Sequence, residues 1–465
     1  MIAFMKKTIL ILFTLVAALS VTAQTVEGSW TGKLDVMGTQ LNLVFNITKG
    51  ADGAFACTMD SPDQGAKGIP AEITVTDGVK VKISMPALMA AYEGELKDGM
   101  MKGTFTQSGM SFALDMKPGT VERRRPQTPK EPYPYTTEEV TFTNTADNAT
   151  LSGTLTYPVG FDGMKKGTVP VVIMVTGSGL QNRDEEIFDH KPFLVIADFL
   201  ARNGIATLRY DDRGAGKSTG DAANGTTENN MKDALAAVEY ARATGKFGRT
   251  GVLGHSEGGA IAFMLAARGK ADFIVSMAGP GVRGDSILLA QNRRGMMQGG
   301  VPADMADDYC KVIAKVFAVM AQPGTVVDPA AKVREIAKEV SVSLPEPLVQ
   351  NLAKSMEICT PWLKYFIGYD PSADIRGAKC PVMAVNGSKD VQVVAADNLA
   401  AIRRLLPENS LNLIKEYPGL NHLFQHCTTG MTTEYGQIEE TVSPEVMQDI
   451  AAWIAKVARS VAFRH

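Results

Sequence analysis

Apolar and polar positions alternate along much of the first hundred residues. Apolar side chains fall at every second position over 41–47 and again over 79–83, a period that is typical of strands with one buried face. Asp-Gly pairs, which favour two-residue hairpins because glycine tolerates a positive φ, stand at 52–53, 77–78 and 98–99. These patterns predict a small all-β domain over residues 24–118, either an antiparallel meander or a barrel.

Residues 119–136 lose this periodicity and are rich in proline and charge, so we predict a linker. The run Arg123-Arg124-Arg125 lies among four prolines within it. The net charge of the whole chain is −3. A solvated linker therefore explains the arginines better than a nucleic-acid site does, and no nucleic-acid partner is expected.

The pattern changes again at residue 137, where short apolar segments begin to alternate with helical ones. Strands are predicted over 138–146, 150–157, 171–175, 205–210, 251–254, 273–277, 381–385 and 411–414. Helices are predicted over 192–202, 229–244, 258–268, 303–320 and 329–341, and from Pro444 onwards with Ser443 as the N-cap. Such alternation predicts an α/β domain over 137–465, with a doubly wound, mostly parallel sheet.

One stretch interrupts the alternation. No convincing strand lies between Gly281 and Trp362, although helical patterns recur there. In open α/β sheets, ligands bind at the carboxyl ends of the strands. We therefore interpret residues 283–362 as a helical cap over that edge.

The sequence "GHSEGGA" at 254–260 follows a predicted strand and precedes a predicted helix. A G-x-S-x-G motif in this context is a nucleophile elbow, in which glycines permit a sharp turn around the serine. Ser256 is therefore the predicted nucleophile. A serine hydroxyl needs a base to react at neutral pH.

The chain has five histidines, and in this architecture the catalytic order is serine, then acid, then histidine. His422 follows the last predicted strand and is the predicted base, with His426 as the alternative. Asp390 follows the preceding strand and is the predicted acid, whereas Asp397 falls in the next helix. His255 is expected to point away from its neighbour Ser256.

Backbone N–H groups must stabilise the negative oxygen of a tetrahedral intermediate. The N–H of Glu257 is one predicted donor. The loop after the strand 171–175 reads "TGSGLQNRDE" and brings the backbone close to substrate. Ser178 is the predicted second donor, with Gly179 as the alternative. Asp211, Arg213 and Gly214 are expected to brace loops.

Several stretches resemble one family in their order along the chain, namely "TGSG…RDE", "RYDDRG", "GHSEGG", "CPVMAVNGSKDVQV" and "NHLF". Residues 138–460 resemble the alpha/beta-hydrolase superfamily, and within it bacterial carboxylesterases related to serine aminopeptidases. The resemblance implies hydrolysis of short-chain carboxylic esters through an acyl-enzyme, with a small-molecule ester substrate and no metal or organic cofactor. Thr176 stands where many members carry a histidine.

Two other functions stay open. An exported serine peptidase would need a group that binds a peptide amine, such as Glu257 or a carboxylate of the cap. A catalytically inactive scaffold would use the fold for binding. The all-β domain, 24–118, is in either case a candidate for contact with a ligand or with another subunit.

The N-terminus is typical of an export signal. Lys6 and Lys7 precede an apolar run over 9–21 that ends at a small-residue cleavage site. We predict a signal peptide, 1–23, cleaved after Ala23, a periplasmic or secreted protein, and no membrane span in the mature chain. The five cysteines are scattered without CxxC spacing, so no zinc site is expected.

Overall fold

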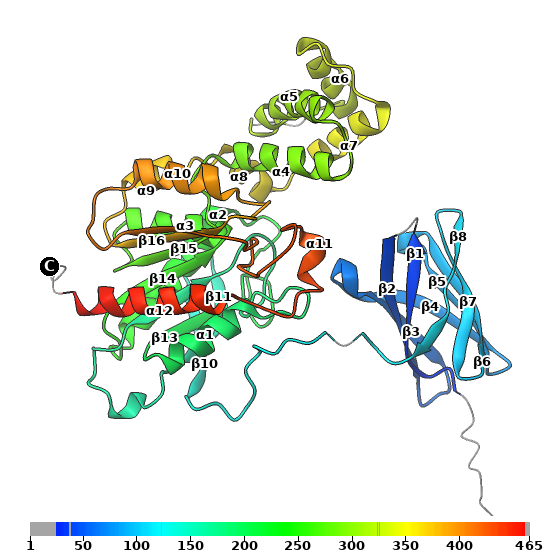
Figure 1. The fold of residues 1–465 in the computed structure, drawn as a ribbon, viewed down its shortest axis with the longest axis horizontal. Helices are drawn as coiled ribbons and strands as arrows, with labels where there is room; N and C mark the ends of the chain where they lie inside the picture. The colour runs from blue at the N-terminus through cyan, green and yellow to red at the C-terminus, as the bar shows by residue number, and fades with distance from the viewer. Residues whose placement is uncertain (1–24, 37–38, 122, 323, 325, 461–465) are drawn as a thin grey trace, which may run out of the picture. The chain divides into compact units, whose positions relative to one another are not determined.

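The structure is a computed structural model that describes residues 25–460 except 37–38, 122, 323 and 325. The chain divides between residues 122 and 123 into two compact units, coloured from blue to cyan and from cyan to red in Figure 1. The predicted signal peptide lies outside the described residues.

The smaller unit consists of antiparallel strands. They are β1 (Gly28–Val36), β2 (Thr39–Lys49), β3 (Phe55–Ser61), β4 (Ala66–Thr76), β5 (Lys80–Met85), β6 (Ala90–Lys97), β7 (Met100–Gln107), β8 (Met110–Ala113) and β9 (Met116–Pro118). Their order is β6-β5-β4-β3-β2-β1-β9-β7-β8, and an additional pairing of β6 with β7 closes the sheet. Of the two predicted forms, the unit therefore has that of a barrel.

The turns and core of the barrel follow from its sequence pattern. Asp98 and Gly99 have φ values of 52° and 76° and connect β6 to β7 as a two-residue hairpin, in which Lys97 pairs with Met100. The alternating apolar side chains point inward. Trp30, Phe45 and Tyr92 belong to a buried cluster that packs the interior.

The larger unit contains a sheet of mixed direction. Its strands are β10 (Thr137–Asn144), β11 (Ala149–Thr156), β12 (Val171–Val175), β13 (Ala206–Tyr210), β14 (Thr250–His255), β15 (Ile274–Met277), β16 (Val382–Gly387) and β17 (Leu413–Tyr417). The order is β10-β11-β13-β12-β14-β15-β16-β17. β10 and β11 are antiparallel to their neighbours, and the strands from β13 to β17 are parallel.

Helices cover both faces of this sheet. They are α1 (Pro192–Arg202), α2 (Thr227–Ala243), α3 (Glu257–Ala267), α9 (Ser372–Arg376), α10 (Ala395–Leu405), α11 (Thr432–Tyr435) and α12 (Pro444–Arg459). Side chains of α2, α3 and α10 share one apolar cluster with the sheet, and those of α1 and α12 share the other. The sheet is therefore doubly wound, with a core on each face.

Between β15 and β16 the described residues form helices and no strand. Besides α9, these helices are α4 (Gly284–Gln298), α5 (Ala303–Met320), α6 (Pro329–Glu339), α7 (Glu346–Glu357) and α8 (Pro361–Gly368). α4 and α8 lie next to the sheet, and α5, α6 and α7 project beyond them (Figure 1). The projecting helices have a buried cluster of their own, which includes Val316, Ile336 and Leu352.

The arginine run does not behave as a solvated linker. The guanidinium of Arg125 donates hydrogen bonds to the carbonyl oxygens of Phe188, Gly436 and Ile438. The side chain of Arg123 is only 7% exposed. A guanidinium offers five N–H donors in a fixed fork, so one side chain can satisfy several loop carbonyls. The segment that begins at Arg123 is therefore fastened to the larger unit.

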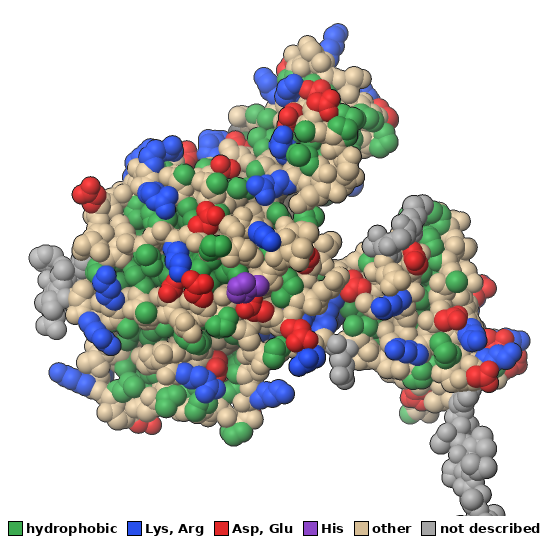
Figure 2. Space-filling view, in the orientation of Figure 1, with side chains coloured by type: hydrophobic (Ala, Val, Ile, Leu, Met, Phe, Trp, Pro, Cys, Tyr) green, Lys and Arg blue, Asp and Glu red, His purple; other side chains and the backbone are tan. Residues whose placement is uncertain are grey.

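Charges of both signs are interspersed over the face of the molecule seen in Figure 2, with apolar side chains between them. No helix within the described part of the chain has both the length and the apolar character needed to cross a membrane.

Candidate active site

Ser256 occupies the sharp turn between β14 and α3. Its φ of 53° and ψ of −120° are unusual for a residue that is not glycine. The neighbouring glycines allow the turn because there is no room for side chains. A Cβ at Gly254 would lie 1.8 Å from the carbonyl oxygen of Gly258, and one at Gly258 would lie 2.1 Å from that of Val175. The strained turn presents the serine at the carboxyl end of the sheet.

His422 and Asp390 lie together in the loops after β17 and β16. Nδ1 of His422 is 2.7 Å from Oδ2 of Asp390, and the two residues are 4% and 1% exposed. The other carboxylate oxygen of Asp390 accepts the backbone N–H groups of Gln392 and Val393 at 2.8 and 2.9 Å. A carboxylate in this setting accepts hydrogen bonds, so Nδ1 carries the proton. Nε2 of His422 is then left with a lone pair, as a general base requires.

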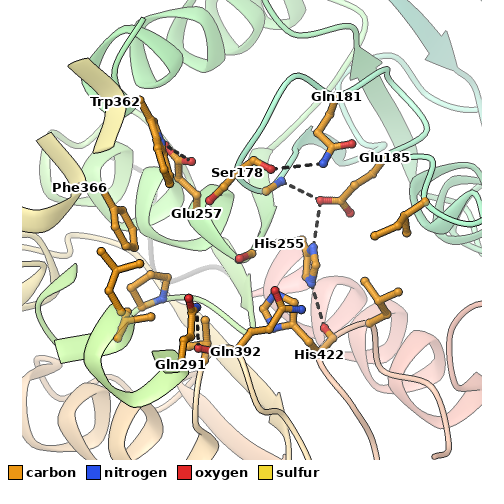
Figure 3. Close-up of a pocket in the computed structure, with 18 of the residues that line it drawn as sticks. Ser178, Gln181, Glu185, His255, Glu257, Gln291, Trp362, Phe366, Gln392 and His422 are labelled. Atoms are coloured by element: carbon orange, nitrogen blue, oxygen red, sulfur yellow. Dashed lines mark hydrogen bonds and ion pairs between the residues drawn. The ribbon is translucent and has the colours of Figure 1, made fainter. Parts of the chain in front are cut away.

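Ser256 and His422 line the same cavity, which has a volume of about 240 Å³. The cap helices α4 and α8 contribute Leu288, Trp362 and Phe366 to its apolar wall (Figure 3). Two helices of the insertion therefore form part of the wall of this cavity.

The residues predicted to stabilise the oxyanion do not all line the cavity of Ser256. Ser178 and Glu257 line the cavity with Ser256, whereas Gly179 lines a neighbouring one. The backbone N–H of Gly177 donates to Oε1 of Glu185 at 2.7 Å and is already committed. The geometry thus favours Ser178 over Gly179 as a backbone donor toward Ser256.

A carboxyl group supports the oxyanion loop from behind. Thr176, the residue that departs from the family pattern, donates through Oγ1 to Asp212 Oδ1 at 2.7 Å. Oδ2 of Asp212 accepts the N–H of Gln181 at 2.9 Å. Burial raises the pKa of Asp212 to about 8, and the nearby carboxylates Glu185 and Glu257 act in the same direction. Asp212 therefore holds this loop through Thr176 and Gln181.

The loop after β13 holds the ion pairs that its sequence led us to expect. Arg183 pairs with Asp211, and Arg213 pairs with Asp147 and Asp233. These contacts brace loops and do not reach the cavity of Ser256.

The alternative acid and base lie elsewhere. The side chain of His426 is 66% exposed and pairs with Glu440 at 2.9 Å. Asp397 lies in α10 and lines a different cavity. The ring of His255 is fully engaged, since Nδ1 lies 2.9 Å from Glu185 Oε1 and Nε2 lies 2.9 Å from the carbonyl oxygen of His422. It is thus unavailable to take a proton from Ser256.

The side chain of Glu257 joins the elbow to the cap. Its Oε2 accepts a hydrogen bond from Nε1 of Trp362 at 2.9 Å, and Glu257 is 2% exposed. Burial raises the pKa of this carboxyl group. A carboxyl group with a raised pKa therefore belongs to the residue next to Ser256.

Comparison with known proteins agrees with this topology. The family model of the serine aminopeptidases, S33, matches residues 191–297, the segment from α1 through the elbow into α4. The strand order, the strained serine after β14, and the histidine and aspartate after β17 and β16 accompany this match. The larger unit has the alpha/beta-hydrolase fold.

The chain also resembles individual proteins. Esterase EstD of Thermotoga maritima is 25% identical over 307 residues, which are 66% of this chain and 66% of that protein, or just under two thirds of its length. A solved esterase of Pyrococcus furiosus aligns with 73% of this chain and 99% of its own, at 18% identity and a TM-score of 0.40. A proline iminopeptidase of Mycobacterium smegmatis aligns with 69% of this chain and 99% of its own, at 15% identity and a TM-score of 0.41.

Three residues of this site make contacts that the sequence did not predict. Glu185 stands within the quoted loop "TGSGLQNRDE", and its position eight residues after Gly177 is the only local signal. Asp212 is the second of two adjacent aspartates after β13. The hydrogen bond from Trp362 to Glu257 joins positions 105 residues apart, so no local pattern could have found that bond.

Proposed function

We propose that the protein is an exported serine hydrolase that cleaves carboxylic esters of short acyl chain. The observation that carries this proposal is the strained Ser256 in one cavity with His422, whose Nδ1 is held 2.7 Å from buried Asp390. The sequence likeness to hydrolases, among them an esterase, supports the same class of reaction.

In the proposed reaction, Ser256 attacks the ester carbonyl while Nε2 of His422 takes its proton. His422 then delivers that proton to the leaving alcohol, and Asp390 stabilises the imidazolium that forms in between. The backbone N–H groups of Glu257 and Ser178 stabilise the negative oxygen. Water repeats the sequence on the acyl-enzyme and releases the acid.

The preference for a short acyl chain follows from the size of the cavity. Pockets for drug-sized ligands usually measure about 300–1,000 Å³, whereas this one measures about 240 Å³. Its apolar wall, with Leu288 and Phe366, suits a small acyl group. We expect kcat/KM to fall from p-nitrophenyl acetate or butyrate toward p-nitrophenyl palmitate.

The central test is covalent labelling of the folded protein with a fluorophosphonate, compared with the Ser256→Ala variant. We expect a label on the wild-type protein and none on the variant. His422→Ala should reduce the labelling rate by several orders of magnitude, because the serine loses its base. A folded wild-type protein without serine-dependent label would favour the inactive binding scaffold instead.

A serine aminopeptidase is the second candidate, and the buried carboxyl of Glu257 favours it. A carboxylate beside the nucleophile could bind the amine of a peptide, and the family model that matches is that of serine aminopeptidases. Turnover of aminoacyl-nitroanilides at or above the turnover of p-nitrophenyl acetate would replace the esterase proposal with this one.

Export is proposed from the sequence of the first 23 residues. Lys6 and Lys7, the apolar run over 9–21 and the small residues before position 24 carry that proposal. Mass spectrometry of the protein purified from expressing cells should show an N-terminus at Gln24.

A further inference from the structure

A second histidine–carboxylate pair lies behind the proposed triad. The imidazole of His255 stands between Oε1 of Glu185 and the carbonyl oxygen of His422, at 2.9 Å from each (Figure 3). The side chains of His255 and Glu185 are 8% and 6% exposed. The pair is therefore a buried part of the site, and it takes no part in the reaction proposed above.

The partners of His255 determine where its protons lie. A backbone carbonyl can only accept, so Nε2 carries a proton. Oε1 of Glu185 already accepts the N–H of Gly177 at 2.7 Å, so the same oxygen faces Nδ1 of His255 as an acceptor. Nδ1 therefore carries a proton as well, and His255 is an imidazolium in contact with a carboxylate.

This pair connects the loop of Gly177 and Ser178 to the loop of His422, and the proposed reaction requires a fixed distance between these two loops. Glu185 fixes Gly177 in the oxyanion loop, next to Ser178. His255 fixes the backbone of His422 itself. The two contacts of the imidazole join residues 70 and 167 positions away from it in the sequence.

We propose that His255 and Glu185 are positioning residues, and that the imidazolium–carboxylate pair sets the backbone of His422 relative to the oxyanion loop. The inference rests on the proposed function for its kinetic consequences, but the charge state of His255 stands without it. A misplacement of reacting groups by about 1 Å can reduce a rate on the order of a hundredfold.

The groups that face His255 predict how the pair responds to pH. They are Glu185, the ring of His422 with its centroid 4.7 Å away, and Asp390. Burial by itself lowers the pKa of His255, but the charge and hydrogen bond of Glu185 outweigh burial, and the pKa is raised. The raised pKa thus preserves the charged pair to a higher pH than an ordinary histidine would. The pair breaks as the pH rises through the raised value, because a bare Nδ1 then faces a carboxylate.

Nuclear magnetic resonance of histidine ring nitrogens tests the charge state without any need for activity. The full chain with the Ser256→Ala substitution is labelled with ¹⁵N-histidine, and His255 is assigned by comparison with the same chain carrying His255→Gln. We expect two protonated ring nitrogens on His255 at pH 7. A single protonated nitrogen would overturn the proposal, whether or not the protein hydrolyses esters.

Kinetics with p-nitrophenyl acetate then test the positioning role. Glu185→Ala and His255→Gln should each lower kcat ten- to hundredfold with little change in KM. Glu185→Gln should keep more activity than Glu185→Ala, because its amide oxygen can take the place of Oε1 and still accept the N–H of Gly177, while the loss of the negative charge leaves His255 neutral. That variant should also lack the decline of kcat/KM at alkaline pH.

Glu186→Gln is the matched control, since it removes a neighbouring carboxylate that pairs only with Lys191 at 3.7 Å among the described contacts. Its kinetics should equal those of the wild type. Wild-type kcat in Glu185→Ala or His255→Gln would contradict the proposal. The proposal would also be contradicted if kcat/KM of Glu185→Gln declined at alkaline pH as it does in the wild type. That result would give His255 and Glu185 a structural role only. Thermal unfolding of every variant separates these results from a failure to fold.

Discussion

At the scale of single residues, the site depends on carboxyl groups that serve different purposes. Asp390 is held as an acceptor by two backbone N–H groups and by His422. Glu185 accepts from Gly177 and His255. Two others are unusual acids, because burial raises the pKa values of Asp212 and Glu257. These differences predict different responses to substitution and to pH.

Asp212→Asn should stabilise the protein at alkaline pH. The pKa of Asp212 is about 8 in the folded protein and 3.8 in the reference state. Between these values the unfolded chain binds fewer protons than the folded one, so the wild-type protein loses stability as the pH rises. The melting temperature of the variant, relative to that of the wild type, should therefore increase from pH 5 to pH 9. A constant difference across this range would show that Asp212 titrates normally.

Trp362→Phe should weaken the contact between the elbow and the cap. The substitution keeps the aromatic stacking on Phe366, whose ring centroid is 5.3 Å away. It removes the N–H donor to Glu257 Oε2, and an unsatisfied buried polar group costs about 1–3 kcal/mol. The indole N–H also lowers the pKa of Glu257. Its loss raises that pKa, so urea unfolding should show a stability deficit that is larger at pH 9 than at pH 5. Equal deficits at both values would argue against an ionising Glu257.

Local sequence predicted the residues whose positions depend on short segments. Ser256 stands in the turn of a seven-residue stretch, and Asp390 and His422 follow consecutive strands of the parallel sheet. Contacts between loops were not predictable. Glu185 and His255 lie 70 residues apart, and their pairing depends on how the loop after β12 folds back over the end of β14. His255 could be set aside as the base, but its actual partners could not be inferred.

At the scale of elements, the sequence predicted the bounds of a strand or helix well where its hydrophobic periodicity was clear. β12 covers Val171–Val175 and α5 covers Ala303–Met320, both with the predicted bounds. The last helix begins at Pro444 as predicted, but Ser443 makes no side-chain cap hydrogen bond. The segment that begins at Arg123 departs further from expectation. Its composition is that of a linker, and its arginines instead bind loop carbonyls that lack partners in regular structure.

Arg125→Ala should destabilise the larger unit. The guanidinium donates to the carbonyl oxygens of three loop residues. Each hydrogen bond from a charged group contributes about 1.5–3 kcal/mol to the free energy of unfolding, and water or nearby donors replace part of this when the side chain is removed. We expect urea unfolding to show a loss on the order of 3 kcal/mol. KM should rise as well, because Ile187 and Tyr435, near these carbonyls, line the cavity.

Two further variants sharpen that measurement. Arg125→Lys should fall between the wild type and the alanine variant, since one ammonium cannot serve three separated carbonyls. Arg124→Ala is the matched control, because its neighbouring side chain is 78% exposed. If Arg124→Ala were as costly as Arg125→Ala, a general effect of charge would explain the result better than the hydrogen bonds do.

At the scale of the whole molecule, the two units have separate hydrophobic cores. The residues that line the cavity of Ser256 all belong to the part of the chain after residue 122. The barrel interior is packed by its own side chains, including Trp30 and Tyr92. The proposed chemistry therefore rests on the larger unit alone.

A chain that begins at residue 123 should fold and hydrolyse p-nitrophenyl acetate with a kcat/KM within about twofold of that of the longer protein. It retains both clusters that pack the faces of the sheet, and each fully buried large side chain contributes roughly 1.5–3 kcal/mol. Circular dichroism and thermal unfolding would establish that it is folded. A folded but inactive chain would assign the barrel a part in the reaction.

The hydrogen bond from His255 to the carbonyl oxygen of His422 also has a consequence in time. It joins positions 167 residues apart, and a ribosome adds residues from the N-terminus at about 5–20 per second. Ser256 is therefore synthesised many seconds before His422 and Asp390. In the proposed reaction, the serine stays an ordinary hydroxyl until the final strand joins the sheet, so the moment at which Ser256 becomes reactive should mark the completion of folding.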